Sequence, residues 1–408
     1  MNIIFILQSN PFYNNSAFGN RYKGIINGLL RCGNHITLVI TDGYCSESEK
    51  VNNGYQSSWK DRDVFNVYYT LKLDSSNIWF KRANLYFLSR FVMRINSALL
   101  MPYFRKQYDY YFIGNDLTSL YAYNKNSKKI SINSVIEINE FDDIFLYQKL
   151  NFFQRSRSKL YRKEFEKAIK RINCFAFMTK ALLEHYKPRI NREAKLFHLP
   201  MTVEMSRFSK KEKDTTYSKP YIAYTGTFSN AKDGVDILIK SFAKIANKYP
   251  QYHLYLAGFW HYDVSMQEEL IEKFGLKHRI TYLGVLNKDQ IPAFVCNADL
   301  LVLSRPDSHQ AQGGFPTKLG EYLATGNPVC VTKVGEIPDY LEDNVSAFMA
   351  TPGDVDSFAD AMDRALSNPD NAKRVGLTGL QVAQREFNSE IQAKRLSEFL
   401  KQNLEKRL

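Results

Sequence analysis

Residues 313–329 read GGFPTKLGEYLATGNPV and carry the most specific pattern in the chain. Two adjacent glycines precede Pro316 and Thr317, which are residue types that often open a helix. A short helix is expected next, and a Gly-x-Pro turn at Gly326 then leads into an apolar run. The stretch therefore predicts a glycine-rich loop, a helix and a buried strand in succession, which is one step of an α/β fold.

The same alternation of strands and helices extends outward through the whole chain. Helices with clear apolar spacing are expected at 24–31 and 235–248. Strands are expected at 3–7, 36–41, 110–113, 134–138, 174–178, 221–224, 253–257, 280–283, 300–303 and 328–332. Strands that alternate with helices in both halves predict two doubly wound α/β domains with parallel sheets.

A polar, charged segment that ends at Pro220 separates the two halves. With 408 residues, the chain is longer than one ordinary core. We predict an N-terminal domain at 1–203, a linker at 204–219 and a C-terminal domain at 220–385. Residues 386–408 have helical apolar spacing, and we expect this last helix to pack back on the N-terminal domain.

The cysteine content and the apolar segments indicate the cellular compartment of the protein. The chain has 5 cysteines, an odd number at wide spacings and without a Cys-x-x-Cys pair, which argues for a reducing compartment. The apolar N-terminus lacks the basic start and cleavage site of a signal peptide, and no stretch reaches the roughly 18 apolar residues of a spanning helix. We therefore expect a cytoplasmic protein.

Positive charge is concentrated in the first half of the chain. The net charge is +13, and residues 1–205 hold 30 Lys and Arg against 17 Asp and Glu. An anionic partner is expected for this half. Basic and aromatic residues alternate over 79–106 and basic residues crowd 154–171, which suits a peripheral helix on an anionic membrane. The open alternative is a helix that packs its apolar face on the sheet and exposes its basic face to solvent. Nucleic acid is not an expected partner, because this half has no recognition motif.

Two loops have the chemistry of an anion site. The expected helix start near Thr317 offers free N–H groups and a helix dipole, and Lys318 adds a positive charge. Glu321 follows one turn later, within reach of ribose hydroxyls. Lys232 lies at the start of a second expected helix, after the strand and turn that end at Gly226, where a diphosphate would fit. The alternative for 313–329 is a loop and helix that pack without a ligand.

These stretches resemble the signature of the family 4 glycosyltransferases, in which a Glu, seven residues and a second Glu straddle such a loop. The resemblance implies the GT-B fold: two Rossmann-like domains that face each other across the active site, with the acceptor on the N-terminal domain and the donor on the C-terminal domain. It implies that Glu321 binds the donor ribose. The residues implied to hold the donor sugar and phosphates are Gly226, Thr227, Lys232, Gly313, Gly314, Phe315, Pro316, Thr317, Lys318 and Leu319.

The chain also departs from the family pattern. The first Glu of the pair is replaced by Gly313, and the Arg expected after Gly226 is replaced by Thr227. A His that assists catalysis at the end of an N-domain strand corresponds to Asn139. Glu140, the next residue, is a candidate base or stabiliser of positive charge on the sugar, or part of an acidic surface turn with Asp142 and Asp143.

A loop after the first strand corresponds to the family's segment that faces the donor phosphates and the acceptor. It contains Gly19 and Arg21. Arg21 either steers an anion or is a solvated residue at a helix start.

The resemblance implies a retaining glycosyltransferase of the hexosyl type. It would move a sugar from a nucleotide-sugar donor to a glycan or lipid-diphosphate-linked acceptor in the synthesis of a capsule, exopolysaccharide or lipopolysaccharide. The three departures keep a non-catalytic binding subunit open, and another two-domain nucleotide-sugar enzyme, such as an epimerase, is a further alternative. No metal or other cofactor is expected, since the pairs Asp61/Asp63 and Asp354/Asp356 fit an Asp-x-Asp pattern that is common by chance.

Overall fold

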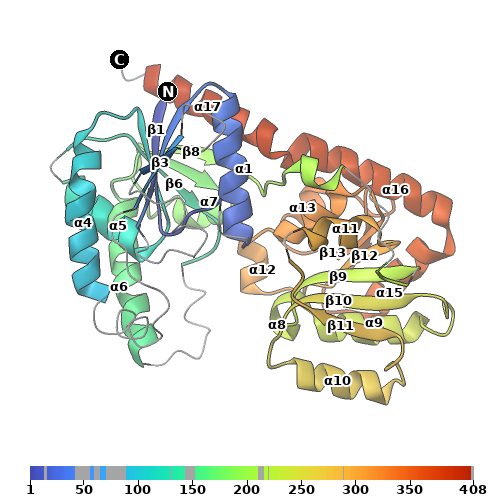
Figure 1. Cartoon of the computed structure of the whole chain (residues 1–408). Coiled ribbons are helices and arrows are strands. Elements are labelled where there is room, and N and C mark those ends of the chain that lie inside the picture. Colours follow the sequence, from blue (N-terminus) through green and yellow to red (C-terminus); the bar gives the residue numbers. More distant parts are fainter. Residues whose placement is uncertain are drawn as a thin grey trace. The chain divides into compact units, whose positions relative to one another are not determined.

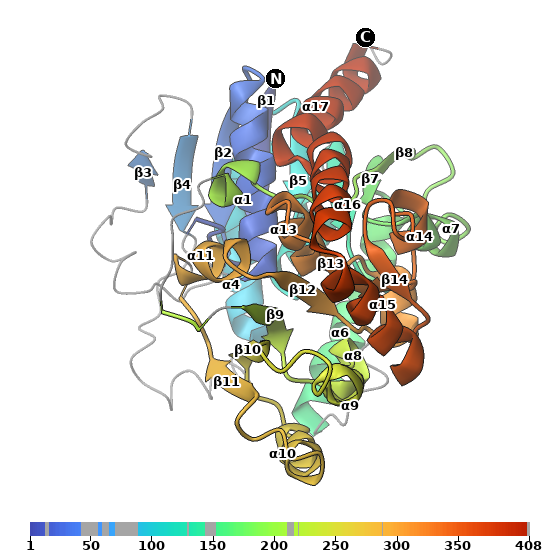
Figure 2. The same ribbon diagram turned by 90° about the vertical axis from the view of Figure 1, so that its right-hand side faces the viewer.

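A computed structural model describes two α/β units (Figures 1 and 2). The described residues are 1–12, 16–41, 56–58, 65–69, 89–128, 130–142, 152–209, 216–218, 220–287 and 289–405. The first unit comprises Met1–Leu199 with Gln392–Leu408, and the second comprises Pro200–Ile391. The division thus falls at Leu199, ahead of the segment 204–219 that the sequence suggests as a linker.

The first unit is built on one mainly parallel sheet. Its described strands are β1 (Asn2–Leu7), β2 (His35–Ile40), β3 (Gln56–Ser58), β4 (Phe65–Tyr69), β5 (Tyr110–Ile113), β6 (Ser134–Ile138), β7 (Cys174–Phe177) and β8 (Lys195–His198). They lie in the order β3-β4-β2-β1-β5-β6-β7-β8, and only the β3–β4 pair among them is antiparallel. The inner strands β1, β5 and β7 are mainly apolar and buried on both faces, which is typical of parallel sheets.

Helices cover both faces of this sheet. They are α1 (Ala17–Arg31), α4 (Ser89–Arg105), α5 (Leu117–Asn126), α6 (Phe152–Ile169), α7 (Lys180–Tyr186) and α17 (Ser389–Glu405). The helix expected at 24–31 starts earlier, where the Ser16 side chain caps α1 by accepting from Gly19 N. In Figure 1, α4, α5 and α6 lie on the face of the sheet opposite α1.

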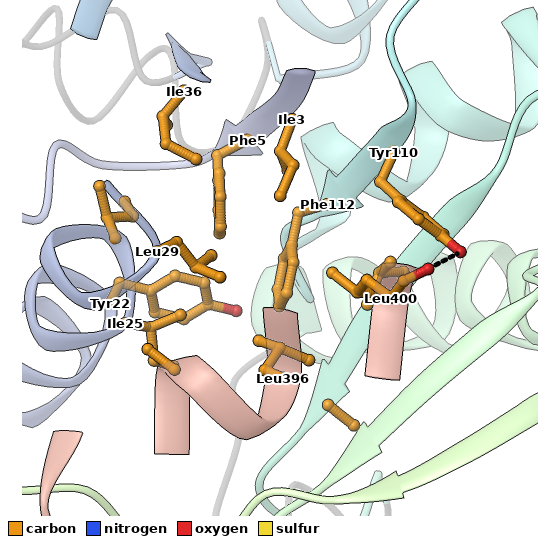
Figure 3. Close-up of a cluster of buried hydrophobic side chains, with 14 of the residues drawn as sticks. Ile3, Phe5, Tyr22, Ile25, Leu29, Ile36, Tyr110, Phe112, Leu396 and Leu400 are labelled. Atoms are coloured by element: carbon orange, nitrogen blue, oxygen red, sulfur yellow. Dashed lines mark hydrogen bonds between the residues drawn. The ribbon is translucent and has the colours of Figure 1, made fainter. Parts of the chain in front are cut away.

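The C-terminal helix α17 belongs to the core of the first unit (Figure 3). Leu396 and Leu400 lie beside α1 and the sheet residues Phe5 and Phe112, all of them fully buried. The Tyr110 hydroxyl donates to the Leu400 carbonyl over 2.9 Å. The end of the chain therefore closes one face of the first sheet.

The second unit holds a parallel sheet whose strand order reverses once (Figure 2). Its described strands are β9 (Tyr221–Thr227), β10 (His253–Phe259), β11 (Ile280–Gly284), β12 (Leu300–Leu303), β13 (Val329–Thr332) and β14 (Phe348–Ala350). Their order is β11-β10-β9-β12-β13-β14, so successive strands are added on one side of β9 up to β11 and on its other side from β12 onward. Open α/β sheets bind ligands beyond the carboxyl ends of the strands at such a switch point.

Helices surround this second sheet. They are η3 (Met205–Phe208), α8 (Asn230–Asp233), α9 (Val235–Ile245), α10 (Val264–Lys273), α11 (Gln290–Cys296), α12 (His309–Gly313), α13 (Thr317–Ala324), α14 (Ile337–Tyr340), α15 (Val355–Ser367), α16 (Pro369–Val382) and η4 (Ala383–Phe387). The predicted fold class, two doubly wound α/β sheets, is confirmed. Across the described part of the chain, none of the helices has the length and apolar character to cross a membrane.

Candidate functional site

The carboxyl end of β9 lies very close to the backbone at the end of β10. A Cβ on Gly258, at the end of β10, would lie 1.5 Å from the Gly226 carbonyl oxygen, so the two strand ends meet where neither residue has a side chain. Ser229 then caps α8 by accepting from Lys232 N. Lys232 itself is exposed, at the position where the sequence predicts a phosphate contact.

Lys318 reaches the end of β9 from helix α13. A Cβ on Gly226 would lie 2.1 Å from its Nζ atom, so glycine leaves the space that the ammonium fills. Nζ donates to Asp233 Oδ2 over 2.8 Å, and the Tyr224 hydroxyl lies 2.9 Å from the same oxygen. Helix α13 thereby places a charge at the switch point of the sheet.

The ion pair between Lys318 and Asp233 is buried, with side chains 15% and 4% exposed. Burial by itself would raise the pKa of Asp233, but the ammonium and the Tyr224 hydroxyl outweigh it and hold that pKa below its usual range. Arg305, another buried cation, adds to the positive potential at this carboxylate. Sequence spacing gave no signal for Asp233 or Arg305, because they come from separate elements.

The start of α13 has open backbone donors. Pro316 is the N-cap residue and gives no side-chain cap, and the helix begins at Thr317. The N–H of Leu319 is bonded to the Pro316 carbonyl. Within the described part of the chain, the N–H groups of Phe315, Thr317 and Lys318 donate no hydrogen bond. These donors and the helix dipole suit an anion.

Glu321 lies one turn into α13 and pairs with Arg207. Arg207 Nη1 donates to Glu321 Oε1 over 3.1 Å. Burial raises the pKa of Glu321, and the Arg207 guanidinium, together with the Lys318 ammonium, opposes that rise. The carboxylate is thus held beside the open donors by a residue that the sequence did not single out.

Gly313, Gly314 and Phe315 also belong to the predicted donor motif, and the structure shows what surrounds them. Gly313 ends α12, and Gly314 follows it in an extended conformation. The Phe315 ring is buried against Tyr340 and Phe387, with centroids 5.6 Å and 5.2 Å away. Its side chain therefore belongs to the core, and only its backbone is placed to meet a ligand.

The structure corrects two placements in the first unit, while the acceptor-side role of Gly19 and Arg21 stays a prediction. Gly19 lies inside the first turn of α1, where its N–H bonds to the Ser16 hydroxyl, rather than in an open loop. Arg21 is not solvated: it is 3% exposed, forms an ion pair with Glu137 and donates to the Leu199 carbonyl over 2.9 Å. Its buried side chain therefore connects β6 to the segment that follows β8.

The residues after β6 divide between surface and core. Glu140 is exposed, and Asn139 is half-buried with no hydrogen bond to its Oδ1 from the described residues. Asp142 contradicts the surface-turn alternative, because it is buried and accepts from the Tyr186 hydroxyl and from Arg189 over 2.9 Å and 3.0 Å. Asp143 lies outside the described residues.

The Asp-x-Asp pairs have no shared ligand geometry among the described residues. The Asp354 side chain caps α15, and Asp356 pairs with Lys244. Asp61 and Asp63 lie outside the described residues. Within those residues, no three His, Cys, Asp or Glu side chains gather as a metal site would need.

The comparisons with known proteins identify a family for part of the chain. Residues 206–381 match the family model Glycosyl transferases group 1. This part of the chain is a glycosyl transferases group 1 domain. An Erwinia amylovora relative, the amylovoran biosynthesis glycosyltransferase AmsK, is 23% identical over 203 residues, covering 49% of each chain. The chain spans about half or less of the length of the curated relatives it matches.

Solved glycosyltransferase structures share the whole fold. Sucrose-phosphate synthase from Thermosynechococcus elongatus matches 98% of both chains with a TM-score of 0.73 and 14% identity. Anabaena HepE, solved with UDP and glucose, matches 98% of this chain and 100% of its own with a TM-score of 0.69 and 15% identity. The predicted GT-B fold is confirmed by these matches.

Proposed function

We propose that the chain is a retaining glycosyltransferase of the hexosyl type, similar to family 4, that transfers a sugar from a nucleotide-sugar donor. The proposal rests on the arrangement of polar and charged groups around α13 in the group 1 domain. Open N–H groups, the Lys318 ammonium and the Glu321 carboxylate occur within two turns of one helix, and Lys318 touches the end of β9. A nucleoside diphosphate has the matching charges and hydroxyls.

In this proposal, the donor diphosphate binds the N–H groups of Thr317 and Lys318 and the Lys318 ammonium. Lys232, exposed at α8, is the second cation, and Glu321 accepts from the ribose hydroxyls. These groups meet the diphosphate charge without a metal ion. Anabaena HepE, which has the same fold, was solved with UDP and glucose, and this supports a donor of that class.

The acceptor is proposed to be a glycan or a lipid-diphosphate-linked glycan in surface polysaccharide synthesis. The name of the Erwinia relative, an amylovoran biosynthesis glycosyltransferase, supports this. Glu140 is the candidate base or charge stabiliser in the first unit, because its side chain is exposed after β6, and Asn139 stands beside it.

We also propose that α6 lies on an anionic membrane surface at the cytoplasmic face. Its residues Glu164, Phe165, Ala168 and Ile169 are buried, which leaves a basic outer face. The exposed basic residues of that face and of the turn after it are Arg155, Arg157, Lys159, Lys163, Lys167, Lys170 and Arg171. Such a face is attracted to anionic lipid headgroups.

A thermal-shift screen against UDP, GDP, ADP, CMP and their sugar conjugates tests the donor site. A bound nucleotide raises the melting temperature by mass action. We expect stabilisation by one nucleotide class, with loss of the shift in Glu321→Ala. Mass spectrometry of the same mixtures then separates the alternatives: donor consumption that needs an acceptor supports transfer, turnover without an acceptor supports an epimerase, and binding without turnover supports a non-catalytic subunit.

A further inference from the structure

The charged partner of Glu321 comes from outside the loop and helix that carry the donor motif. Arg207 lies on η3, 114 residues earlier in the chain, and donates to Glu321 Oε1 over 3.1 Å. The two side chains are only 15% and 20% exposed. An arginine–carboxylate hydrogen bond that is largely withdrawn from water is stronger than one on the surface.

The backbone that carries Arg207 is fixed against α13. A Cβ on Gly320 would lie 2.1 Å from Met201 Cε, so the helix and the segment before η3 meet at a residue without a side chain. The next residue of the helix is Glu321. On the other side of η3, Phe208 is buried and its carbonyl accepts from Cys296 Sγ of α11. Arg207 is therefore presented to Glu321 from a packed element.

The ion pair favours the charged form of Glu321. Burial favours the neutral acid, and Arg207 is the strongest group that opposes it. A carboxylate accepts stronger hydrogen bonds from hydroxyl groups than a neutral acid does. An ionised Glu321 without Arg207 would also add negative charge one turn from the open N–H groups of α13, where the diphosphate is proposed to bind.

We propose that Arg207 is a positioning residue for donor binding, an inference that rests on the proposed function. It keeps Glu321 as a carboxylate and occupies Oε1, which leaves Oε2 for the ribose hydroxyls. Among the described residues, no group donates a hydrogen bond to Oε2. Arg207 acts through Glu321 and does not itself contact the donor.

The test measures the affinity of the full chain for UDP-glucose by calorimetry between about pH 5 and pH 9, a range that brackets a raised Glu pKa. The diphosphate of UDP-glucose stays fully ionised over this range. For Arg207→Gln we expect binding about tenfold weaker at the alkaline end, from loss of a charge-assisted contact. The loss of affinity should grow as the pH falls. Without the guanidinium the pKa of Glu321 rises further, so the neutral acid forms at a higher pH than in the wild type.

Three further variants separate this role from simple packing. Arg207→Lys keeps the charge, so we expect the midpoint of its pH profile to return toward that of the wild type. Glu321→Gln removes the titrating group, so its affinity should vary little with pH. The matched control is Arg364→Gln, which removes another 3.1 Å arginine–carboxylate bond in the same unit, to Asp343, and should leave the profile unchanged.

Two results would overturn the inference in distinguishable ways. If Arg207→Gln binds as the wild type does, or is weaker by the same factor at every pH, Arg207 has no effect on the charge of Glu321, and the donor site stands without it. If the wild-type chain binds none of UDP-glucose, GDP-mannose and ADP-glucose, the donor site itself is refuted and the role of Arg207 falls with it.

Discussion

Replacing Lys318 by methionine should strongly destabilise the second unit, because it leaves the Asp233 carboxylate buried without its ammonium. Asp233 is 4% exposed, and Lys318 Nζ lies 2.8 Å from its Oδ2. Removing one partner of such a buried pair costs about 3–5 kcal/mol. The remaining Tyr224 hydroxyl still donates to Asp233, which favours the lower end, about 3 kcal/mol.

The pH dependence of this effect has a definite sign. In the wild type the pKa of Asp233 is depressed, so its contribution to stability is present above the unfolded pKa and is lost as the pH falls through the folded pKa. In Lys318→Met, burial raises the pKa instead, and the carboxylate can protonate in the folded state. The difference between variant and wild type should therefore shrink as the pH falls from neutral through the raised pKa of Asp233 in the folded variant.

Urea unfolding of the full chain at neutral and acidic pH provides the assay. The control is Lys244→Met, which breaks an exposed ion pair with Asp356 and should change the free energy of unfolding by less than about 1 kcal/mol. The double variant Asp233→Asn with Lys318→Met should recover much of the loss, because no buried carboxylate is left without its ammonium. The reasoning is refuted if Lys318→Met costs no more than Lys244→Met, or if the double variant is as unstable as the single one.

Three other changes have expected outcomes. Gly226→Ala places a Cβ 2.1 Å from Lys318 Nζ at a residue with φ +149°, so the thermal shift with the nucleotide that stabilises the wild type should be lost; an unchanged shift would contradict the site geometry. Ser16→Ala removes the cap of α1 and should lower the free energy of urea unfolding by about 1 kcal/mol, whereas Ser16→Asp should not. Asp142→Asn breaks the contacts with Arg189 at neutral pH. Because those contacts and the Tyr186 hydroxyl hold the pKa of Asp142 below its usual range despite burial, the stability difference from the wild type should close as the pH falls below about 4; a constant difference would show that the charge is not involved.

Apolar periodicity was enough to predict most of the fold. The inner strands β1, β5, β9 and β12 are runs of buried apolar residues, and parallel strands of this kind give a strong signal. The apolar pattern does not mark β3, β4 and β8 of the first unit or β14 of the second, and β3, β8 and β14 lie at the edges of their described sheets. β8 is only partly buried along its length, so its sequence lacks the apolar run that marks an inner strand.

The start of α1 was misplaced for a different reason. Its first turns carry Arg21, which reads as a surface residue in the sequence. The structure buries it against Glu137, which lies 116 residues away, and such a pairing has no local pattern. A buried ion pair between distant elements makes a helical face look polar when it is in fact part of the core.

The residues of the proposed donor site were predictable only where they lie in one of the two sequence motifs. Lys318 and Glu321 follow the glycine-rich loop at helical spacing, so their shared position could be expected. Asp233 and Arg207 reach the same place from α8 and η3, 85 and 114 residues away from their partners. Nothing in their own sequence neighbourhoods marks them, and only the folded arrangement shows that they pair with the two motif residues.

A crystal structure of this chain with the nucleotide-sugar that stabilises it would locate the donor directly. We expect the diphosphate to bind the N–H groups of Thr317 and Lys318, the ribose hydroxyls to donate to Glu321 Oε2, and Arg207 to remain on Oε1. A nucleotide bound elsewhere, or a diphosphate that leaves the start of α13 empty, would contradict this expectation.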